Sequence, residues 1–166
     1  MPNPRTARFA EPMPAKALRI RRAIGADHEG LVALEYGTFT SDRLSPRQWA
    51  RHLDSDSARV LVAIAERELI GAAVLFFRAR SKVARLYSLA IESRARGRGI
   101  GNALLDAAEQ HARGKGCTRL RLEVRRDNKA AQRLYERRGY RVVGKFAAYY
   151  EDGEDATRYE KVLLGD

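Results

Sequence analysis

The first residues whose types and spacing suggest chemistry form a glycine-rich turn. A mostly apolar run, residues 86–91, suits a strand, and an amphipathic segment begins at residue 100. The turn lies between these two segments and includes the start of the second one. Its residues are Arg96, Gly97, Arg98, Gly99, Ile100, Gly101 and Asn102. Glycine lets a ligand approach the backbone because it has no Cβ. The N–H groups of residues 97–102 would then converge on a phosphate at the positive end of the following helix.

The spacing of these glycines excludes two familiar nucleotide motifs. Gly97, Gly99 and Gly101 are spaced G-x-G-x-G, whereas the dinucleotide fingerprint requires G-x-G-x-x-G. No Gly-Lys-Ser/Thr follows, so the turn is not a Walker loop either. By itself the turn predicts a pyrophosphate site, and a structural turn without a ligand stays open as the alternative.

The elements that must position this turn follow from hydrophobic periodicity. We expect strands at 18–22, 60–65, 69–77, 83–91, 120–124, 140–146 and 158–164. Helices are expected after Asp27 and after Ser45, each of which suits an N-cap, with Pro46 in the first turn of the second helix. Two more helices are expected from Ile100 to Gly114 and from Asn128, also an N-cap, to Gly139. The strands at 60–65 and 69–77 suit a hairpin. This order predicts a mixed α/β protein whose middle is too rich in strands for a doubly wound fold.

The composition of the chain restricts the possible classes of partner and cofactor but does not identify the function. The chain has 166 residues and a net charge of +11, which favours an anionic partner: nucleic acid, an anionic membrane or a phosphorylated cofactor. One cysteine, Cys117, excludes an intramolecular disulfide, and His28, His52 and His111 have no metal-binding spacing, so we expect no metal. Residues 1–17 hold four prolines and suggest a flexible arm before one domain, 18–166. No run is long enough to span a membrane, so we expect a cytoplasmic protein.

A second segment gives the turn a specific meaning. The run LEVRRDNKAAQRLYERRGY, residues 122–140, follows the Arg-x-x-Gly-x-Gly turn. Together they resemble the GCN5-related N-acetyltransferase (GNAT) superfamily, and most closely the bacterial ribosomal-protein N-terminal alanine acetyltransferases. The resemblance covers about 18–164 and extends to the tail YYEDGEDA, residues 149–156. It implies a mostly antiparallel sheet of about seven strands with about four helices, and a splayed parallel pair at the site of acetyl-CoA.

The resemblance assigns roles to the residues of the site. The turn becomes the pyrophosphate site of acetyl-CoA, Leu89, Ala90 and Ile91 its pantetheine contacts, and Asn128 a further contact that is equally a helix N-cap. Glu123 stands where the family has its proton acceptor, and Tyr135 is the candidate acid for the departing thiolate. Side chains alternate along a strand, so Glu123 faces away from Leu122 and Val124. The open alternatives are an ion-paired carboxylate for Glu123 and a core aromatic for Tyr135.

The acceptor is less well defined than the donor. Glu35, Phe39, Tyr149 and Tyr150 are candidates for binding it, and the acidic loop after Tyr150 would attract a cationic amine. Phe39 lacks the Pro-Trp that follows this position in the ribosomal enzymes, which leaves the acceptor open. We expect an N-terminal α-amine of a protein or peptide, attacking directly in a ternary complex. The alternatives are a small amine, a protein lysine, or a non-enzymatic nucleic-acid-binding role, and the protein is expected to be a monomer or a homodimer.

Overall fold

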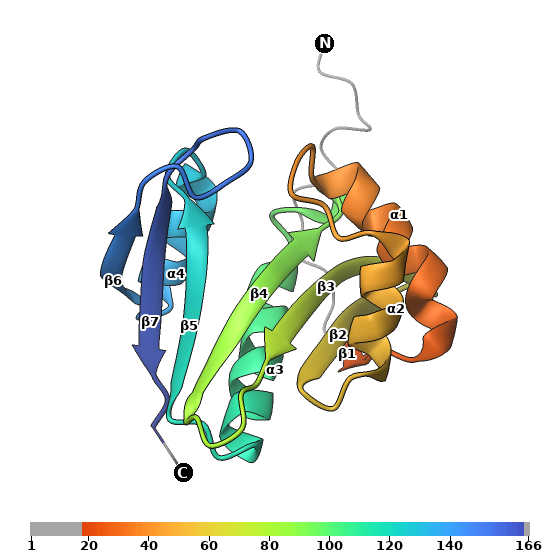
Figure 1. The fold of residues 1–166 in the computed structure, drawn as a ribbon. Coiled ribbons are helices and arrows are strands. Elements are labelled where there is room, and N and C mark those ends of the chain that lie inside the picture. Colours follow the sequence, from red (N-terminus) through yellow and green to blue (C-terminus); the bar gives the residue numbers. More distant parts are fainter. Residues whose placement is uncertain (1–17, 165–166) are drawn as a thin grey trace.

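The computed structural model describes residues 18–164, and these residues build one sheet flanked by helices (Figure 1). The strands are β1 (Leu18–Arg22), β2 (Ala58–Ala65), β3 (Glu68–Phe76), β4 (Val83–Ile91), β5 (Arg119–Arg125), β6 (Arg141–Phe146) and β7 (Ala156–Val162). The helices are α1 (His28–Thr38), α2 (Pro46–Asp54), α3 (Ile100–Gly114) and α4 (Lys129–Arg137), and short 3₁₀ turns η2 (Gly25–Asp27) and η3 (Ser93–Ala95) precede α1 and α3. The flexible arm predicted for residues 1–17 lies outside the described residues.

The sheet confirms the mixed, mostly antiparallel architecture. Its strand order is β1-β2-β3-β4-β5-β7-β6. The pair β4 and β5 is parallel, and the other neighbouring pairs are antiparallel. Parallel neighbours need a long crossover, and α3 supplies it here. The predicted hairpin is present as β2 and β3.

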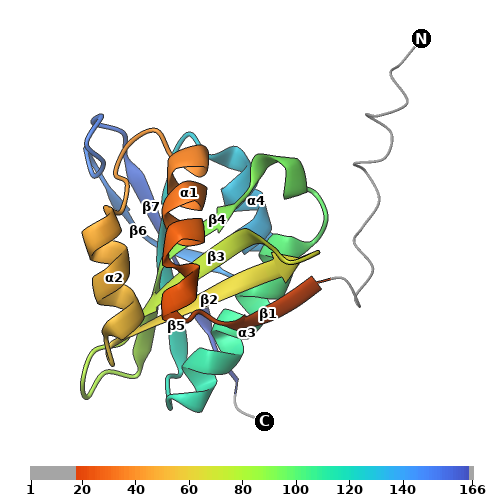
Figure 2. The same ribbon diagram turned by 90° about the vertical axis from the view of Figure 1, so that its right-hand side faces the viewer.

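Two hydrophobic clusters lie on opposite faces of the sheet. On one face, α1 and α2 bury Leu31, Leu34 and Trp49 against β2 and β3 (Figure 2). On the other face, α3 and α4 bury Leu104, Leu105 and Tyr135 among residues of the strands. The alternating burial along β5 follows from this arrangement, because every second side chain faces the core. No helix within residues 18–164 combines the length and apolarity needed to cross a membrane.

The parallel pair separates part of the way along β4. Register pairs join β4 to β5 from Val83 and Arg119 as far as Leu86 and Leu122. On the other edge of β4, the register to β3 shifts, so that Tyr87 becomes an extra residue between Leu86 and Ser88. Such a bulge bends a strand and increases its twist. Beyond this point β4 and β5 diverge, as Figure 1 shows, which confirms the predicted splayed pair.

Local sequence signals fix most helix ends. Ser45 accepts a hydrogen bond from the Gln48 N–H, and Asn128 accepts one from the Ala131 N–H, so both predicted N-caps are confirmed. The prediction for Asp27 as a side-chain cap of α1 is wrong. Its carboxylate instead accepts two hydrogen bonds from Arg21, at 2.7 and 2.9 Å, and one from the Ile24 N–H. An ion pair with the adjacent strand outcompetes the cap at this position.

Helix α3 lies close to the sheet because Gly71 on β3 has no side chain. A Cβ at this position would lie 3.1 Å from Leu104 Cδ1, 3.2 Å from the Ala90 carbonyl oxygen and 3.3 Å from Ile100 Cγ2. The carbonyl belongs to a strand of the sheet and cannot move away without breaking strand pairing. The contact therefore fixes the distance between the sheet and the helix that begins at the glycine turn.

We expect Gly71→Ala to lower the free energy of unfolding by about 1–3 kcal/mol, because the added methyl overpacks a rigid contact. Urea denaturation measures this change. The matched control is Gly37→Ala, since Gly37 is exposed in α1 and a Cβ there meets no atom within 4 Å. Gly37→Ala should raise the stability by about 0.5–1 kcal/mol. Equal effects at the two positions would contradict the packing argument.

Candidate active site

The glycine turn adopts the conformation that an anion cradle needs. Gly97 and Gly99 have φ of +78° and +81°, and a Cβ built on either would meet no atom within 4 Å. Gly99 is the N-cap of α3, and the first turn of that helix contains no acidic residue. The first N–H groups of a helix have no intrahelical partner, so those after Gly99 are available to an anion. The space beside the turn and the free donors together fit a phosphate group.

The arginines around the turn differ in their partners. Arg94, which was not among the predicted site residues, forms an ion pair with Glu92 at 2.7 Å. Arg96 donates from Nε to the Ile91 carbonyl at 3.4 Å. Arg98 lies between the two left-handed glycines. Arg94 is thus paired within the protein, and Arg96 and Arg98 are the cationic contacts that the sequence motif predicts for this turn.

The end of β4 leads from the turn to the separated strands. Leu89 and Ile91 pack against the α3 side of the core, and Ala90 is buried on the opposite side. All three pair with β3, whereas the register to β5 has already ended at Leu86. One edge of this segment therefore keeps backbone donors and acceptors outside the described β4–β5 ladder. An extended, amide-containing ligand can pair with such an edge.

Glu123 lies at the point where β4 and β5 separate, between two arginines. Its side chain is 5% exposed. Oε2 accepts a hydrogen bond from Arg85 Nε at 3.1 Å, and Oε1 accepts one from Arg158 Nε at 3.0 Å. The cluster joins β4, β5 and β7 on the face opposite Leu122, as alternation predicts. Each oxygen keeps a lone pair that a water molecule can use.

Tyr135 lies in the core on the opposite side of the sheet. Its ring contacts Tyr140, at 5.6 Å between centroids, and Tyr159 at 6.3 Å. Burial raises the pKa of the Tyr135 phenol well above its usual range, and the nearby Tyr150 raises this pKa further. The hydroxyl therefore stays protonated and can donate a hydrogen bond at any physiological pH. The electrostatic contact of Tyr135 with Tyr150, on the β6–β7 loop, places Tyr135 near the region between the separated ends of β4 and β5, which we call the gap.

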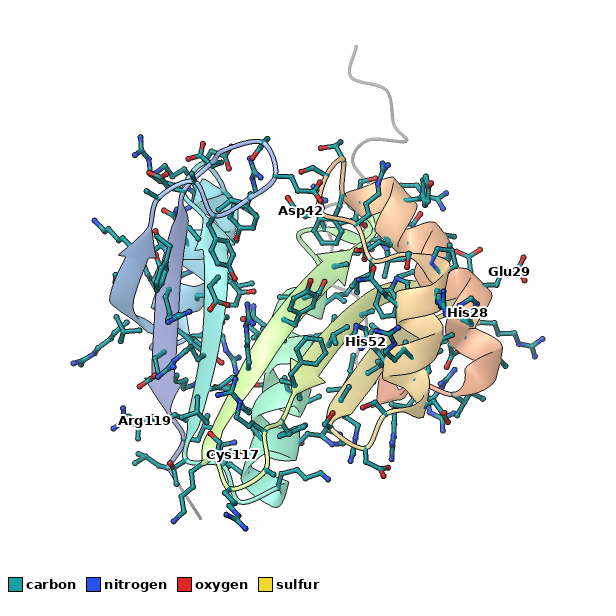
Figure 3. The ribbon with its side chains drawn as sticks, viewed as in Figure 1. His28, Glu29, Asp42, His52, Cys117 and Arg119 are labelled. Atoms are coloured by element: carbon teal, nitrogen blue, oxygen red, sulfur yellow. The ribbon has the colours of Figure 1, made fainter. Side chains whose placement is uncertain are left out.

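The tyrosines of the loop between β6 and β7 border the same gap. The Tyr149 hydroxyl accepts a hydrogen bond from Arg85 at 2.8 Å, so this ring is tied to the Glu123 cluster. The guanidinium of Arg125 lies over the Tyr150 ring, 4.9 Å from its centroid. The loop also reaches the α1–α2 connection, where the N–H of Asp42 donates to the Glu151 carboxylate at 3.4 Å. Figure 3 shows Asp42 at this closed end of the gap.

Two carboxylates of the acidic loop, for which the sequence predicts attraction of a cationic amine, form ion pairs within the protein. Asp152 pairs with Arg125 at 2.5 Å, and Asp155 pairs with Arg126 at 3.3 Å. Glu154 accepts a hydrogen bond from the adjacent Asp155 N–H. The charges of Asp152 and Asp155 are therefore paired within the protein, whereas Glu151 and Glu154 accept hydrogen bonds from backbone N–H groups, so the attraction of a cationic amine by this loop stays a prediction. Sequence alone could not show these ion pairs, because the pairing arginines lie some 27–29 residues away.

The other two predicted acceptor contacts belong to the wall formed by α1 and α2. Glu35 is buried, and its Oε1 accepts a hydrogen bond from the Leu44 N–H at 2.8 Å. Within the described residues, its other oxygen is buried without a hydrogen-bond partner. Burial raises the pKa of Glu35. Phe39 is half-buried against the same cluster, so Glu35 braces the loop and Phe39 packs beneath it.

Three residues of the site were not anticipated from the sequence. Arg85 and Arg158 hold Glu123, and the exposed Tyr87 lies at the bulge of β4. Electrostatic contacts with Arg85, Tyr149 and Glu35 place Tyr87 in the same gap, and burial of part of its ring raises the pKa of its phenol. The signal available beforehand was the charged residue at 85 within an otherwise apolar strand, on the same alternation as Glu123.

The comparisons with known proteins agree with this geometry. Residues 28–140 match the model of the acetyltransferase (GNAT) family. The chain belongs to this family, which confirms the predicted resemblance. Over 72 residues it is 46% identical to an uncharacterized N-acetyltransferase of Methanocaldococcus jannaschii, covering 43% of this chain and 46% of that protein. The chain thus spans about half the length of this relative.

Two solved structures share the whole fold. Ard1 from Thermoplasma volcanium superposes with a TM-score of 0.81 and 26% identity, over 90% of this chain and 99% of that chain. The ribosomal-protein-S18-alanine N-acetyltransferase from Escherichia coli gives a TM-score of 0.80 at 22% identity, over 90% and 96%. At this level of identity the second similarity concerns the fold. Members of the family use acetyl-CoA.

We expect Glu35→Gln to become more stable relative to the wild type as pH rises above about 4.3, the ordinary pKa of a glutamate. The folded protein holds the Glu35 proton more tightly than the unfolded chain does, so ionisation of Glu35 costs stability as pH rises through its raised pKa. Chemical denaturation of both proteins between pH 4 and pH 8 measures the difference. Glu29→Gln, on the exposed side of α1, is the control and should show a nearly constant difference. A constant difference for Glu35→Gln as well would contradict the burial argument.

Proposed function

We propose that this protein transfers the acetyl group of acetyl-CoA to the α-amine at a polypeptide N-terminus. The observation that carries the proposal is the continuity between the glycine turn and the separated strands. The turn fits a pyrophosphate, the unpaired edge of β4 fits the amides of pantetheine, and Glu123 and Tyr135 lie beside the gap from opposite faces of the sheet. Family membership supports the donor, and the motif in residues 122–140 supports the acceptor.

The residues of the turn and of β4 would hold acetyl-CoA, which supplies the acetyl group as an activated thioester. The N–H groups of residues 97–102 would bind its pyrophosphate, with Arg96 and Arg98 adding charge. Leu89, Ala90 and Ile91 would pair with pantetheine. Asn128 caps α4 through its side-chain oxygen, and its amide group is available for a further contact. The open space beside Gly97 and Gly99, which a Cβ would fill, is the feature of this chain that fits the ligand.

Glu123 and Tyr135 divide the proton transfers. An N-terminal amine has a pKa near 8, so most of it is still protonated at neutral pH and needs a proton acceptor before it can attack, although it loses its proton more readily than a lysine with a pKa of about 10.4. We assign Glu123 as the proton acceptor through a water molecule bound to a carboxylate oxygen, because both oxygens already accept one guanidinium hydrogen bond. Tyr135 stays protonated in the core and is assigned as the donor to the leaving sulfur.

The donor is tested by ligand binding. We expect acetyl-CoA to raise the melting temperature, and Gly99→Ala to weaken its binding by about tenfold or more, since the methyl occupies the cradle. Gly116→Ala is a matched control because Gly116 also has a φ of +81° and open surroundings, but lies at the far end of α3. Both variants should lose about 1–2 kcal/mol of stability through backbone strain, and only Gly99→Ala should lose affinity. No shift with millimolar acetyl-CoA would count against the donor.

The catalytic assignments are tested by turnover, measured as CoA release with a neutral peptide. Tyr135→Phe should lower kcat by about 10²-fold without changing acetyl-CoA affinity. Tyr140→Phe, an equally buried tyrosine whose hydroxyl lies near Glu109, should have little effect. Glu123→Gln should lower kcat most at low pH, and the deficit should shrink above about pH 8 as solvent deprotonates the amine. An unchanged kcat in either site variant would remove that residue from the mechanism.

The acceptor class is tested by a screen of amines under the same assay. Peptides with free N-termini should release CoA, whereas the same peptides blocked at the N-terminus but containing lysine should not. Polyamines and amino acids form the third arm. Faster turnover of a lysine side chain or of a small amine would replace the polypeptide N-terminus as the acceptor and leave the donor assignment intact.

A further inference from the structure

The face of the sheet that carries Glu123 continues as a row of charged side chains. Arg119, Arg121 and Glu123 alternate along β5 and point to the same face. Arg158 and Glu160 on β7 belong to the same row, because Arg121 is opposite Glu160 and Glu123 is opposite Arg158. Helices α1 and α2 pack over β2, β3 and β4, and no helix within residues 18–164 packs on this part of the face (Figure 1). We call these side chains the arginine row.

At the start of β5, the arginine row contains a second buried carboxylate, that of Glu160, which lies between two arginines. Glu160 Oε1 accepts a hydrogen bond from Arg119 at 2.7 Å, and its Oε2 accepts two from Arg121, at 2.9 and 2.7 Å. The Glu160 side chain is 8% exposed, whereas Arg119 is 52% exposed and Arg121 37%. The buried carboxylate fixes both guanidiniums in place. Each guanidinium has five N–H donors, so most of them remain for a ligand that approaches from solvent.

One approach to Glu123 leads over this row. The α1–α2 connection and the β6–β7 loop meet through Asp42 and Glu151 at one end of the gap. Arg119 lies toward the other end of β5, as Figure 3 shows. A polypeptide whose N-terminus enters beside Glu123 therefore extends along the open face of β5. At about 3.3 Å per residue, Arg121 lies roughly 7 Å and Arg119 roughly 13 Å from Glu123 along the strand.

We propose that the preferred acceptors carry an acidic side chain at about the third to fifth residue after the N-terminus, where Arg121 and Arg119 bind it. The proposal rests on the proposed function and specifies its substrate class. An extended peptide has the same rise per residue as a strand, so its third to fifth residues lie beside Arg121 and Arg119 when its N-terminus lies beside Glu123. Guanidinium groups bind carboxylates through paired hydrogen bonds, and this pair is already held rigid by Glu160.

The charge balance favours an acidic peptide over a nucleic acid. Arg119 and Arg121 around Glu160 carry a net charge of about +1, and so do Arg85 and Arg158 around Glu123. One or two carboxylates match this charge. Nucleic-acid binding depends on many phosphate contacts, each requiring its own cation. The arginine row is therefore suited to a short acidic segment, and binding of RNA becomes an outcome of the test.

The experiment compares peptides that differ in one side chain. Glutamate is placed at position 3, 4 or 5 of an otherwise neutral peptide with a free N-terminus, and each is matched by glutamine and lysine versions. We expect the wild type to show a kcat/KM about tenfold higher for the best glutamate peptide than for its glutamine match, mainly through KM. Arg119→Glu should reduce this ratio to about one and raise the ratio for lysine over glutamine. Arg47→Glu, an exposed residue of α2, is the matched charge control and should leave both ratios as in the wild type.

Three results would overturn the proposal, and each would do so in a distinguishable way. If no peptide is acetylated, the proposed function itself fails. If all peptides are acetylated with equal kcat/KM by wild type and Arg119→Glu, the acidic preference fails and the proposed function stands. If a single-stranded RNA binds the wild type, loses binding in Arg119→Glu, and leaves the peptide ratios unaffected, the row serves nucleic acid instead.

Discussion

Backbone pairing joins β4 to β5 only as far as Leu86 and Leu122, and the candidate site depends on this early end. The extra residue Tyr87 turns β4 away from its neighbour, while the antiparallel register to β3 resumes on the other edge. Donors and acceptors that a regular sheet would use internally are thereby left beside the glycine turn. A continuous parallel ladder would satisfy them and close the gap, so the same sequence motifs on a regular sheet would have no room for a ligand.

Side chains replace the missing backbone pairs at the point of separation. Glu123 accepts hydrogen bonds from Arg85 on β4 and Arg158 on β7, so one buried carboxylate connects three strands where the β4–β5 ladder ends. Removing one partner of a buried ion pair usually costs several kcal/mol, because the remaining charge is left without compensation. The cluster therefore has two functions that compete for the same oxygens. It holds the strands in place, and it presents a carboxylate to the gap.

Most of the fold and the glycine turn of the candidate site could be predicted from the sequence, whereas the ion pairs around Glu123 could not. Hydrophobic alternation gave the strands, and short polar signals at Ser45 and Asn128 gave the helix starts. The glycine turn is a local feature and was predicted as such. The prediction of a side-chain cap failed at Asp27, because its carboxylate pairs with Arg21 on β1, and the ion pair of Asp152 with Arg125 was not anticipated. Ion pairs between strands depend on register, which no single-sequence pattern specifies. For the same reason the partners of Glu123 were missed.

The short parallel pairing of β4 with β5, called the seam here, also divides the sheet into two parts. Strands β1 to β4 form one antiparallel unit and β5, β7 and β6 another, and few backbone bonds cross between them. Buried Glu109 on α3 adds a link to the second unit through Arg138 and Lys161. We expect the amides of these two units to exchange with solvent at different free energies of opening, although one hydrophobic cluster contacts both units. A ligand that pairs with β4 and touches α4 bridges both units, so binding would couple their local unfolding and slow exchange on both sides of the seam together.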